Sequence, residues 1–217
     1  MKLFIDSGNI KDIQTLADIG IIDGVTTNPS LLAKEPGDFR DNLKKICQIV
    51  KGPVSGEVTA TDFAGMMQQG RDIAKIDDHM IVKVPLIRDG IKACKALSGE
   101  NIRVNVTLCF SAAQALLAAK AGATFVSPFV GRLDDIATSG MDLIREIVDI
   151  YRNYSFRTEV LVASCRHPIH VVEAARAGAD IATCPPAVID QMFNHPLTNI
   201  GLEKFLKDWE KAQAVKA

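Results

Sequence analysis

Met80-Ile81-Val82-Lys83-Val84-Pro85 is a short, mostly β-branched apolar run with one lysine near its centre. Turn-forming and acidic residues bound the run, with Asp77-Asp78 before it and Asp89-Gly90 after it. A run of this length and composition is typical of a strand that is buried on both faces in a parallel sheet. The stretch therefore predicts an α/β protein in which Lys83 lies within the sheet.

Lys83 has two interpretations at this point. Burying an unpaired ammonium is costly, so such a lysine is usually paired, solvated in a cavity, or deprotonated by its surroundings. A deprotonated lysine is a nucleophile that can form a Schiff base with a carbonyl compound. The alternative is a lysine near a strand end whose stem packs while its ammonium reaches water.

Outside this run, apolar strand-like segments alternate with helix-like segments along the chain. A helical period of about 3.6 residues marks Phe39 to Val50, Ala112 to Ala121 and Met141 to Tyr151. The alternation predicts a single-domain (β/α)8 TIM barrel with an extra C-terminal helix. The expected strands are Leu3 to Ile5, Gly24 to Thr27, Val54 to Val58, Ile81 to Val84, Ile102 to Thr107, Thr124 to Ser127, Val160 to Ala163 and Ile181 to Thr183.

An internal echo favours the barrel. The segment Ala119-Lys120-Ala121-Gly122-Ala123-Thr124 is followed 56 residues later by Ala175-Arg176-Ala177-Gly178-Ala179-Asp180. Each copy predicts a helix end, a glycine in the left-handed position and the entry to a strand. The competing fold is an open doubly wound sheet, but the chain has neither a Gly-x-Gly-x-x-Gly fingerprint nor a P-loop.

The domain organisation follows from the same alternation. We expect residues 1–200 to form the barrel and residues 201–217 to form a helical extension outside the repeat. In this tail Leu202, Phe205, Leu206 and Trp209 recur at helical spacing and form an apolar face. The extension is therefore expected either to close the barrel or to contact a partner subunit.

Composition narrows the functional classes. The chain has 217 residues, 47% of them hydrophobic and 24% charged, with a formal net charge of −1. Nucleic acid and anionic membranes are poor candidate partners, because no basic field or aromatic-basic run is present. The N-terminus lacks the apolar core of a signal peptide, so we expect a cytoplasmic protein. Its five cysteines are widely spaced and expected to be reduced core residues, although Cys165 adjoins Arg166 in a candidate site loop.

Polar residues fall where the predicted strands end. In a barrel of this kind chemistry takes place at the carboxyl ends of the strands, and residues two apart on a strand face the same way. By this rule one set of side chains can point into one mouth: Asp6, Thr26, Asn28, Ser55, Glu57, Lys83, Asn105, Thr107, Ser127, Phe129, Ser164 and Arg166.

Each of these residues has an ordinary structural alternative. Asp6 could cap the following helix, Asn28 could begin a turn with Pro29, Thr107 could simply favour a strand, and Glu57 could form a salt bridge with Lys83. Polar groups converging in a barrel interior are costly unless water and a ligand use them. Polar residues at the ends of six predicted strands therefore favour a ligand-binding or catalytic site over six separate structural roles.

Two arginines suggest the ligand. Arg132 follows the sixth predicted strand and Arg166 the seventh, and a guanidinium binds phosphate in a bidentate manner. Near a Schiff-base lysine they indicate a phosphorylated carbonyl substrate, unless Asp134 or Asp135 pairs with Arg132 at the surface. A lone pair of histidines, His167 and His170, has no third ligand nearby, so we expect no metal.

The ordered motifs resemble those of the transaldolases, a family that also includes the fructose-6-phosphate aldolases. The resemblance covers nearly the whole chain. It rests on Thr26-Thr27-Asn28-Pro29-Ser30-Leu31, Ile81-Val82-Lys83-Val84-Pro85, Asn105-Val106-Thr107-Leu108, Ser127-Pro128-Phe129-Val130-Gly131-Arg132 and Ala163-Ser164-Cys165-Arg166.

The resemblance implies class I transfer of a dihydroxyacetone unit, without metal or cofactor, between sugar phosphates of the pentose phosphate pathway. Lys83 would form the Schiff base, Glu57 and Thr107 would hold a catalytic water, and Asp6 would take the hydroxyl proton when the C3–C4 bond breaks. The remaining family positions would bind substrate: Thr26, Asn28, Asn105, Ser127 and Phe129 around the carbon chain, and Arg132, Ser164 and Arg166 around the phosphate.

Two positions separate transferase from aldolase within the family. The fructose-6-phosphate aldolases resemble transaldolases but carry glutamine and tyrosine where this chain has Glu57 and Phe129. The resemblance therefore implies a transferase. The alternatives are an aldolase, or a sugar-phosphate binding protein without catalysis. Short members assemble into pentamers or decamers through C-terminal helices, which implies a homo-oligomer here.

Overall fold

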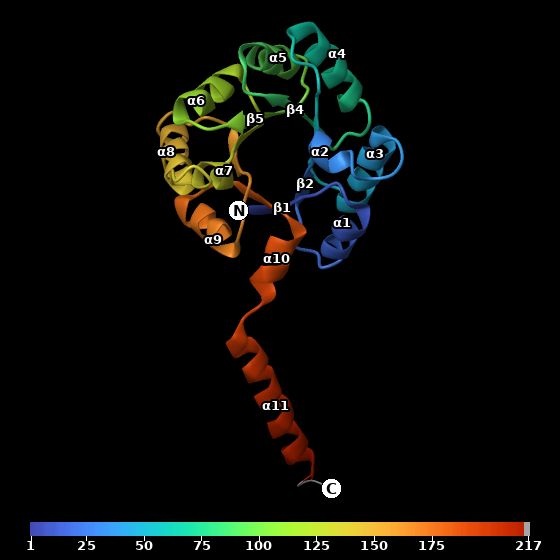
Figure 1. Ribbon diagram of the computed structural model, residues 1–217, viewed down its shortest axis with the longest axis vertical. Coiled ribbons are helices and arrows are strands. Elements are labelled where there is room, and N and C mark those ends of the chain that lie inside the picture. The colour runs from blue at the N-terminus through green and yellow to red at the C-terminus, as the bar shows by residue number, and fades with distance from the viewer. Residues whose placement is uncertain (215–217) are drawn as a thin grey trace.

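The computed structural model describes residues 1–214, and its centre is a closed barrel of eight parallel strands in chain order (Figure 1). Each strand is followed by at least one helix, and the helices surround the barrel. The predicted TIM barrel is confirmed. The strands are β1 (Lys2–Asp6), β2 (Gly24–Thr26), β3 (Val54–Glu57), β4 (Met80–Pro85), β5 (Val104–Cys109), β6 (Phe125–Pro128), β7 (Glu159–Val162) and β8 (Ile181–Cys184).

The helices agree with the sequence periodicity where that periodicity is long. Phe39–Val50 and Ala112–Ala121 have the bounds expected from the sequence. The helices are α1 (Ile10–Ala17), α2 (Pro29–Leu32), α3 (Phe39–Val50), α4 (Phe63–Ala74), α5 (Arg88–Gly99), α6 (Ala112–Ala121), α7 (Val130–Asp134), α8 (Gly140–Asn153), α9 (Pro168–Ala177), α10 (Pro186–Phe193) and α11 (Pro196–Ala214).

Glycine ends α6 and α9 in the way that the internal echo indicates. Gly122 has φ 86° and Gly178 has φ 84°, and each donates its backbone N–H to a carbonyl of the last helical turn. A residue with a Cβ is strained in this left-handed conformation. The two copies of the echo are therefore equivalent turns that connect α6 to β6 and α9 to β8.

The lower barrel interior is an apolar plug. Its fully or nearly fully buried members are Phe4, Ile81, Phe125, Leu161 and Ile181. The rings of Phe4 and Phe125 meet edge to face, with centroids 6.1 Å apart. Because side chains two residues further along a strand point the same way, the next interior layer contains Asp6, Lys83 and Ser127. The plug thus forms the floor on which the polar residues lie.

The main hydrophobic core lies between the strands and the surrounding helices, and it includes all five cysteines. The five cysteines are free thiols and all are buried. Burial raises the pKa of Cys94 and Cys109 to about 11. A hydrogen bond with Cys184 and burial raise the pKa of Cys165 as well. Burial and the raised pKa both disfavour the thiolate of Cys165, which is the reactive form.

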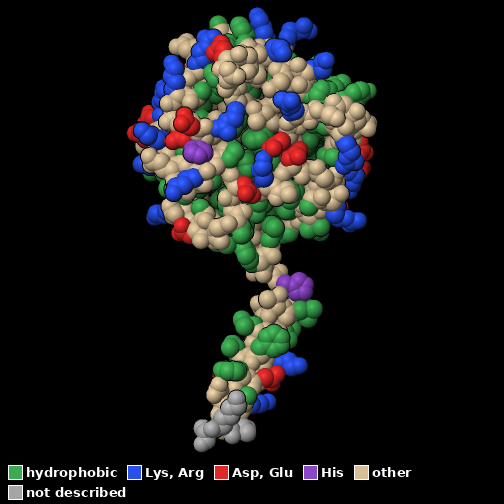
Figure 2. All heavy atoms as spheres, turned by 180° about the vertical axis from the view of Figure 1, so that it is seen from behind, with side chains coloured by type: hydrophobic (Ala, Val, Ile, Leu, Met, Phe, Trp, Pro, Cys, Tyr) green, Lys and Arg blue, Asp and Glu red, His purple; other side chains and the backbone are tan. Residues whose placement is uncertain are grey.

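Helix α11 leaves the barrel and extends away from it (Figure 1). It begins at Pro196, earlier than the boundary expected at residue 201, and residues 215–217 of the expected extension lie outside the described residues. No residue of Pro196–Ala214 is buried. Hydrophobic side chains gather along this helix (Figure 2), namely Leu197, Ile200, Leu202, Phe205, Leu206 and Trp209.

Candidate active site

Lys83 lies near the carboxyl end of β4, between Glu57 on β3 and Asn105 on β5 in the strand register. Lys83 is only 5% exposed. The ammonium nitrogen Nζ lies 2.9 Å from Oε2 of Glu57 and donates a hydrogen bond of 3.0 Å to the carbonyl oxygen of Thr27. The lysine is therefore buried and paired rather than extended to water.

Asp6 ends β1 beside Thr26 of β2. The hydroxyl of Thr26 donates to Oδ1 of Asp6 at 2.8 Å and lies 2.6 Å from the hydroxyl of Thr183. Burial raises the pKa of Asp6, while the Thr26 hydrogen bond and the charge of Lys83 oppose that rise. A carboxylate with a raised pKa is suited to accept a proton during a reaction near neutral pH. Asp6 does not cap α1, since Asn9 does so.

Ser127 and Asn105 form a buried hydrogen-bonded row with Ser55. The Ser127 hydroxyl donates to Oδ1 of Asn105 at 2.7 Å, and Nδ2 of Asn105 donates to the Ser55 hydroxyl at 3.3 Å. All three residues are at most 1% exposed. The row fixes the amide of Asn105, because its oxygen already accepts one hydrogen bond and its nitrogen already donates one.

Thr107 and Asn28 keep unused hydrogen-bonding groups. Thr107 holds the one buried side-chain oxygen that lacks a hydrogen-bond partner within residues 1–214. Such an orphaned group is costly unless water or a ligand satisfies it. Asn28 caps α2 through its oxygen, which accepts from the Leu31 N–H at 3.0 Å, so its amide nitrogen remains for a ligand. Its expected role in the turn with Pro29 and a role in binding are compatible.

The end of β6 brings Phe129 and Arg132 to the mouth. Phe129 packs against the apolar plug from above, and its ring stacks edge to face on Phe110 with centroids 5.7 Å apart. The guanidinium of Arg132 lies 5.4 Å from the centre of the Phe129 ring. Asp134 and Asp135, the expected competitors for Arg132, pair with His170 and Arg166 instead. Arg132 thus keeps its charge for another partner.

The loop after β7 carries Ser164 and Arg166. Ser164 is in the left-handed region with φ 61°, and its carbonyl accepts from the Gly131 N–H at 3.1 Å. The Arg166 guanidinium meets Asp135 at 2.8 Å, but both side chains are more than half exposed. An exposed ion pair contributes little to stability, so a phosphate can replace Asp135 at low cost.

His170 anchors the same loop from α9. Its Nδ1 accepts the Arg166 backbone N–H at 3.2 Å, so the proton of the neutral ring lies on Nε2, which is 3.0 Å from Oδ2 of Asp134. Burial lowers the pKa of His170, which favours that neutral form. The ring of His167 lies 3.9 Å away. His170 therefore holds the loop rather than serving as a spare metal ligand.

A small cavity joins these residues. Its volume is about 190 Å³ and its lining consists of Asp6, Thr26, Asn28, Lys83, Ser127, Phe129, Arg132, Ala163, Ser164, Arg166 and Thr183. It combines a buried amine, a carboxylate, hydroxyl groups from three strands and two guanidinium groups. The arrangement can bind a phosphorylated, hydroxylated carbonyl compound and move protons at its carbonyl.

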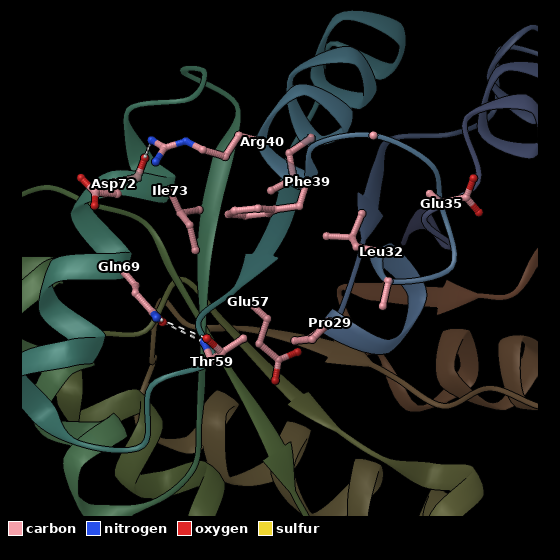
Figure 3. A pocket seen from close by; sticks show the side chains of 13 residues that line it. Pro29, Leu32, Glu35, Phe39, Arg40, Glu57, Thr59, Gln69, Asp72 and Ile73 are labelled. Carbon is pink, nitrogen blue, oxygen red and sulfur yellow. Dashed lines mark hydrogen bonds between the residues drawn. The ribbon is translucent and has the colours of Figure 1, made fainter.

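A larger cavity of about 520 Å³ lies outside the barrel, between α2, α3 and α4 (Figure 3). Its walls include the apolar side chains of Leu32, Phe39 and Ile73, and no lysine, cysteine, serine or histidine of residues 1–214 lines it. Glu57 is part of its lining, and Figure 3 shows the Glu57 carboxylate beside Pro29. Because Glu57 also contacts Lys83, their ion pair connects one lining residue of each cavity. We assign the chemistry to the smaller cavity, which holds the reactive groups.

Most residues selected from the sequence line the small cavity, namely Asp6, Thr26, Asn28, Lys83, Ser127, Phe129, Arg132, Ser164 and Arg166. Four others lie outside its lining: Glu57 contacts Lys83, Asn105 contacts Ser127, Ser55 contacts Asn105, and Thr107 follows Asn105 by two positions on β5. Sequence analysis missed Thr183, which lines it. The same parity rule would have found this residue, because Thr183 is two positions after Ile181 of the plug. The anchor formed by His170 and Asp134 gave no such signal, since it lies on two separate helices.

Two further searches concern only residues 1–214. No group of three or more histidine, cysteine, aspartate or glutamate side chains in that range is arranged to hold a metal ion. Likewise, none of the described helices is long and apolar enough to cross a membrane.

Comparisons with known proteins agree with this geometry. The family described as Transaldolase/Fructose-6-phosphate aldolase matches residues 3–216. A "Probable transaldolase" of Nitrosopumilus maritimus is 58% identical over 215 residues, which cover 99% of this chain and 97% of the relative. A "Probable transaldolase" of Caldicellulosiruptor saccharolyticus is 60% identical over 212 residues, which cover 97% of this chain and 98% of the relative.

A solved structure extends the comparison to the fold alone. The carboxyl transferase domain of Rhizobium etli pyruvate carboxylase has a TM-score of 0.61 at 14% identity, covering 85% of this chain and 40% of that larger chain. The fold is therefore shared with a distant enzyme, whereas the sequence matches are specific and span nearly the full length. This chain belongs to the transaldolase/fructose-6-phosphate aldolase family.

Proposed function

We propose that the protein is a transaldolase of the pentose phosphate pathway that acts through a Schiff base on Lys83. It transfers a dihydroxyacetone unit from fructose 6-phosphate or sedoheptulose 7-phosphate to erythrose 4-phosphate or glyceraldehyde 3-phosphate. The observation that carries the proposal is the buried amine of Lys83, 2.9 Å from Glu57, in a cavity that also holds Asp6 and two arginines.

The first half of the reaction makes the imine. Glu57 accepts a proton from the Lys83 ammonium, and the neutral amine attacks the ketose carbonyl carbon C2 to form a carbinolamine. Protonation of the carbinolamine hydroxyl releases water and leaves a protonated imine. The unpaired Thr107 hydroxyl supports a role with Glu57 in holding the water that carries these protons, because that hydroxyl needs a partner.

The second half breaks and makes the carbon–carbon bond. Asp6 takes the proton of the C4 hydroxyl, the C3–C4 bond breaks, and its electron pair neutralises the iminium to give an enamine. The aldose phosphate leaves, and the enamine attacks the aldehyde of the acceptor while Asp6 returns its proton. Hydrolysis then frees Lys83. The iminium is the electron sink, so this sequence needs no added cofactor.

The remaining residues would orient the substrate. Asn28, Asn105 and Ser127 offer hydrogen bonds to the hydroxyls of the three-carbon unit, and Thr26 holds Asp6 in place. Arg132 and Arg166 with Ser164 would bind the phosphate, because guanidinium groups match its geometry. The charge of Arg132 supports this assignment, since neither Asp134 nor Asp135 pairs with it.

Phe129 favours transfer over release of the free ketone. Its ring borders the cavity and has no hydroxyl to hand a proton to the enamine. The enamine therefore persists until an acceptor aldehyde arrives. The alternative activity is that of a fructose-6-phosphate aldolase, which the presence of Glu57 and Phe129 disfavours by resemblance.

We also propose a division of the chain and a place of action. Residues 1–200 would act as the catalytic barrel and residues 201–217 as an extension that joins copies into a pentamer or decamer. The exposed apolar residues of α11 support this assembly. Five free thiols support a reducing compartment such as the cytoplasm.

The test is intact mass after incubation with fructose 6-phosphate and borohydride, with and without erythrose 4-phosphate. We expect a reduced three-carbon adduct on the wild-type protein, its loss when the acceptor is present, and no adduct on Lys83→Ala. Lys83→Arg serves as a second control, because arginine keeps the charge but cannot form the imine.

Other outcomes select other functions. Release of dihydroxyacetone without an acceptor, at a rate comparable to transfer, would identify an aldolase. Phosphate-dependent binding without a trapped adduct would identify a binding protein.

A further inference from the structure

We propose that Thr183 is a positioning residue that orients Asp6 through Thr26. The proposal rests on the assignment of Asp6 as the base in the function proposed above. Thr183 lies on β8, Asp6 on the neighbouring β1, and Thr26 on β2 beyond it. The hydroxyls of Thr183 and Thr26 therefore meet inside the barrel, across the strand that carries the base.

Counting hydrogens fixes the direction of this chain of bonds. A threonine hydroxyl has one proton to donate and two lone pairs to accept with. Thr26 uses its proton on Oδ1 of Asp6, at 2.8 Å. The 2.6 Å contact between the two hydroxyls must then be donated by Thr183. While Asp6 is ionised, Thr183 thus holds Thr26 in the rotamer that points its proton at the carboxylate.

Burial makes this arrangement effective. Thr183 is 1% exposed and Thr26 is 3% exposed, so bulk water does not compete for either hydroxyl. Below them lies the apolar plug, with Phe4 paired to Thr183 in the strand register. Hydrogen bonds in such low-dielectric surroundings strengthen one another.

As a consequence, the two carboxylate oxygens of Asp6 have different partners. Thr26 occupies Oδ1, which leaves Oδ2 for the C4 hydroxyl of the ketose imine. Without the Thr183 hydroxyl, Thr26 can rotate and the carboxylate can turn with it. Carbon–carbon cleavage should then slow, whereas imine formation on Lys83 should not, because neither threonine contacts the Lys83 amine.

The experiment compares Thr183→Val with Thr183→Ser and the wild-type protein. Valine has the same shape without the hydroxyl, and serine restores the hydroxyl. Each protein is trapped with fructose 6-phosphate and borohydride, and mass spectrometry measures the six-carbon phosphorylated adduct against the three-carbon adduct. The six-carbon adduct is the imine before cleavage, and the three-carbon adduct is the product of cleavage.

We expect Thr183→Val to accumulate the six-carbon adduct and to lose about tenfold in kcat, the order of one buried hydrogen bond. Thr183→Ser should return both values toward those of the wild type. Thr158→Val is the matched control, because Thr158 is buried and donates 2.7 Å to the Ala123 carbonyl, outside the cavity. It should lower the melting temperature without changing the adduct ratio.

Two results would overturn the proposal while leaving the function intact. One is a wild-type adduct ratio and kcat in a folded Thr183→Val protein. The other is a serine variant that behaves like the valine variant, which would show that shape and not the hydroxyl matters. If the wild-type protein forms no adduct, the proposed function itself fails.

Discussion

Among single residues, the pair formed by Lys83 and Glu57 differs from the ion pairs at the surface. Their side chains are 6% and 15% exposed, whereas those of Arg71 and Glu100 are 49% and 39% exposed. Exposed pairs contribute about 0–1 kcal/mol to stability, but removing one partner of a buried pair costs roughly 3–5 kcal/mol. Substitutions at Lys83 and Glu57 are therefore expected to affect folding as well as the proposed activity.

The first prediction concerns this pair. Lys83→Met should abolish transfer and lower the free energy of unfolding by roughly 3 kcal/mol, because it leaves the Glu57 carboxylate without its partner. Adding Glu57→Gln should recover most of that loss without recovering activity. Guanidinium denaturation measures both effects. Equal stability of the single and double variants would contradict the argument.

The second prediction concerns Asp6. Its pKa is raised in the folded protein, so the ionised carboxylate destabilises the fold. This destabilisation is absent below the pKa that Asp6 has in the unfolded protein. It grows as the pH rises from that value through the pKa that Asp6 has in the folded protein. Asp6→Asn, which carries no charge, should therefore raise the melting temperature more at pH 7 than at pH 4 while abolishing transfer. Thermal unfolding at both pH values checks this, and a gain that shrinks with rising pH would refute it.

For single residues, the sequence was sufficient to predict position wherever the residue lies on a regular strand. Strand parity placed Lys83, Glu57 and Asp6 correctly, because their strands are regular and the alternation of side chains is rigid. It did not foresee the backbone of Ser164, which follows the end of β7 in the left-handed region, where parity no longer applies. Nor did it indicate that Asp135 pairs with Arg166 instead of Arg132.

Among the elements, α7 and the loop after β7 depend on one close approach. A Cβ at Gly131 would collide with the Ser164 carbonyl and the Arg166 side chain. Glycine is therefore required to bring α7 against the residues assigned to phosphate. The long elements were foreseen because their periodicity is strong, whereas the short helices α2 and α7 were not, since four or five residues contain too little pattern.

The third prediction tests this approach. Gly131→Ala should raise KM for phosphorylated substrates about tenfold or more, because a shift of the loop moves Ser164 and Arg166. Gly99→Ala is the control, since a Cβ there meets nothing within 4 Å. Steady-state kinetics of the two variants makes the comparison. A Gly131→Ala enzyme with unchanged KM would show that the loop tolerates displacement.

For the whole molecule, α11 is the element that the barrel does not explain. Most of the stability of a helix in a protein comes from packing of its apolar face, and no residue of Pro196–Ala214 is buried against the barrel. The apolar face was evident from the sequence, but its starting point was not, because Pro196 can begin a helix as well as end one. The sequence of one chain does not specify the number of subunits in an assembly.

The fourth prediction concerns this helix. Phe205→Glu combined with Trp209→Glu should reduce the mass in solution to that of a single chain, because charge on the apolar face opposes association. Lys211→Glu is the control, since it lies on the opposite face by the helical period. Light scattering after size-exclusion chromatography measures the mass. A monomeric wild-type protein would refute the proposed assembly.

The layers of the barrel interior separate the residues that maintain the fold from the residues that can be substituted without loss of the fold. Folding relies on the apolar plug of Phe4, Ile81, Phe125, Leu161 and Ile181, whereas the proposed substrate contacts lie above it and on the loops. A substitution at Arg132 or Ser164 is therefore expected to change the proposed contact with phosphate without emptying the plug. Such a barrel can drift toward new substrates by single steps, each of which still yields a folded protein.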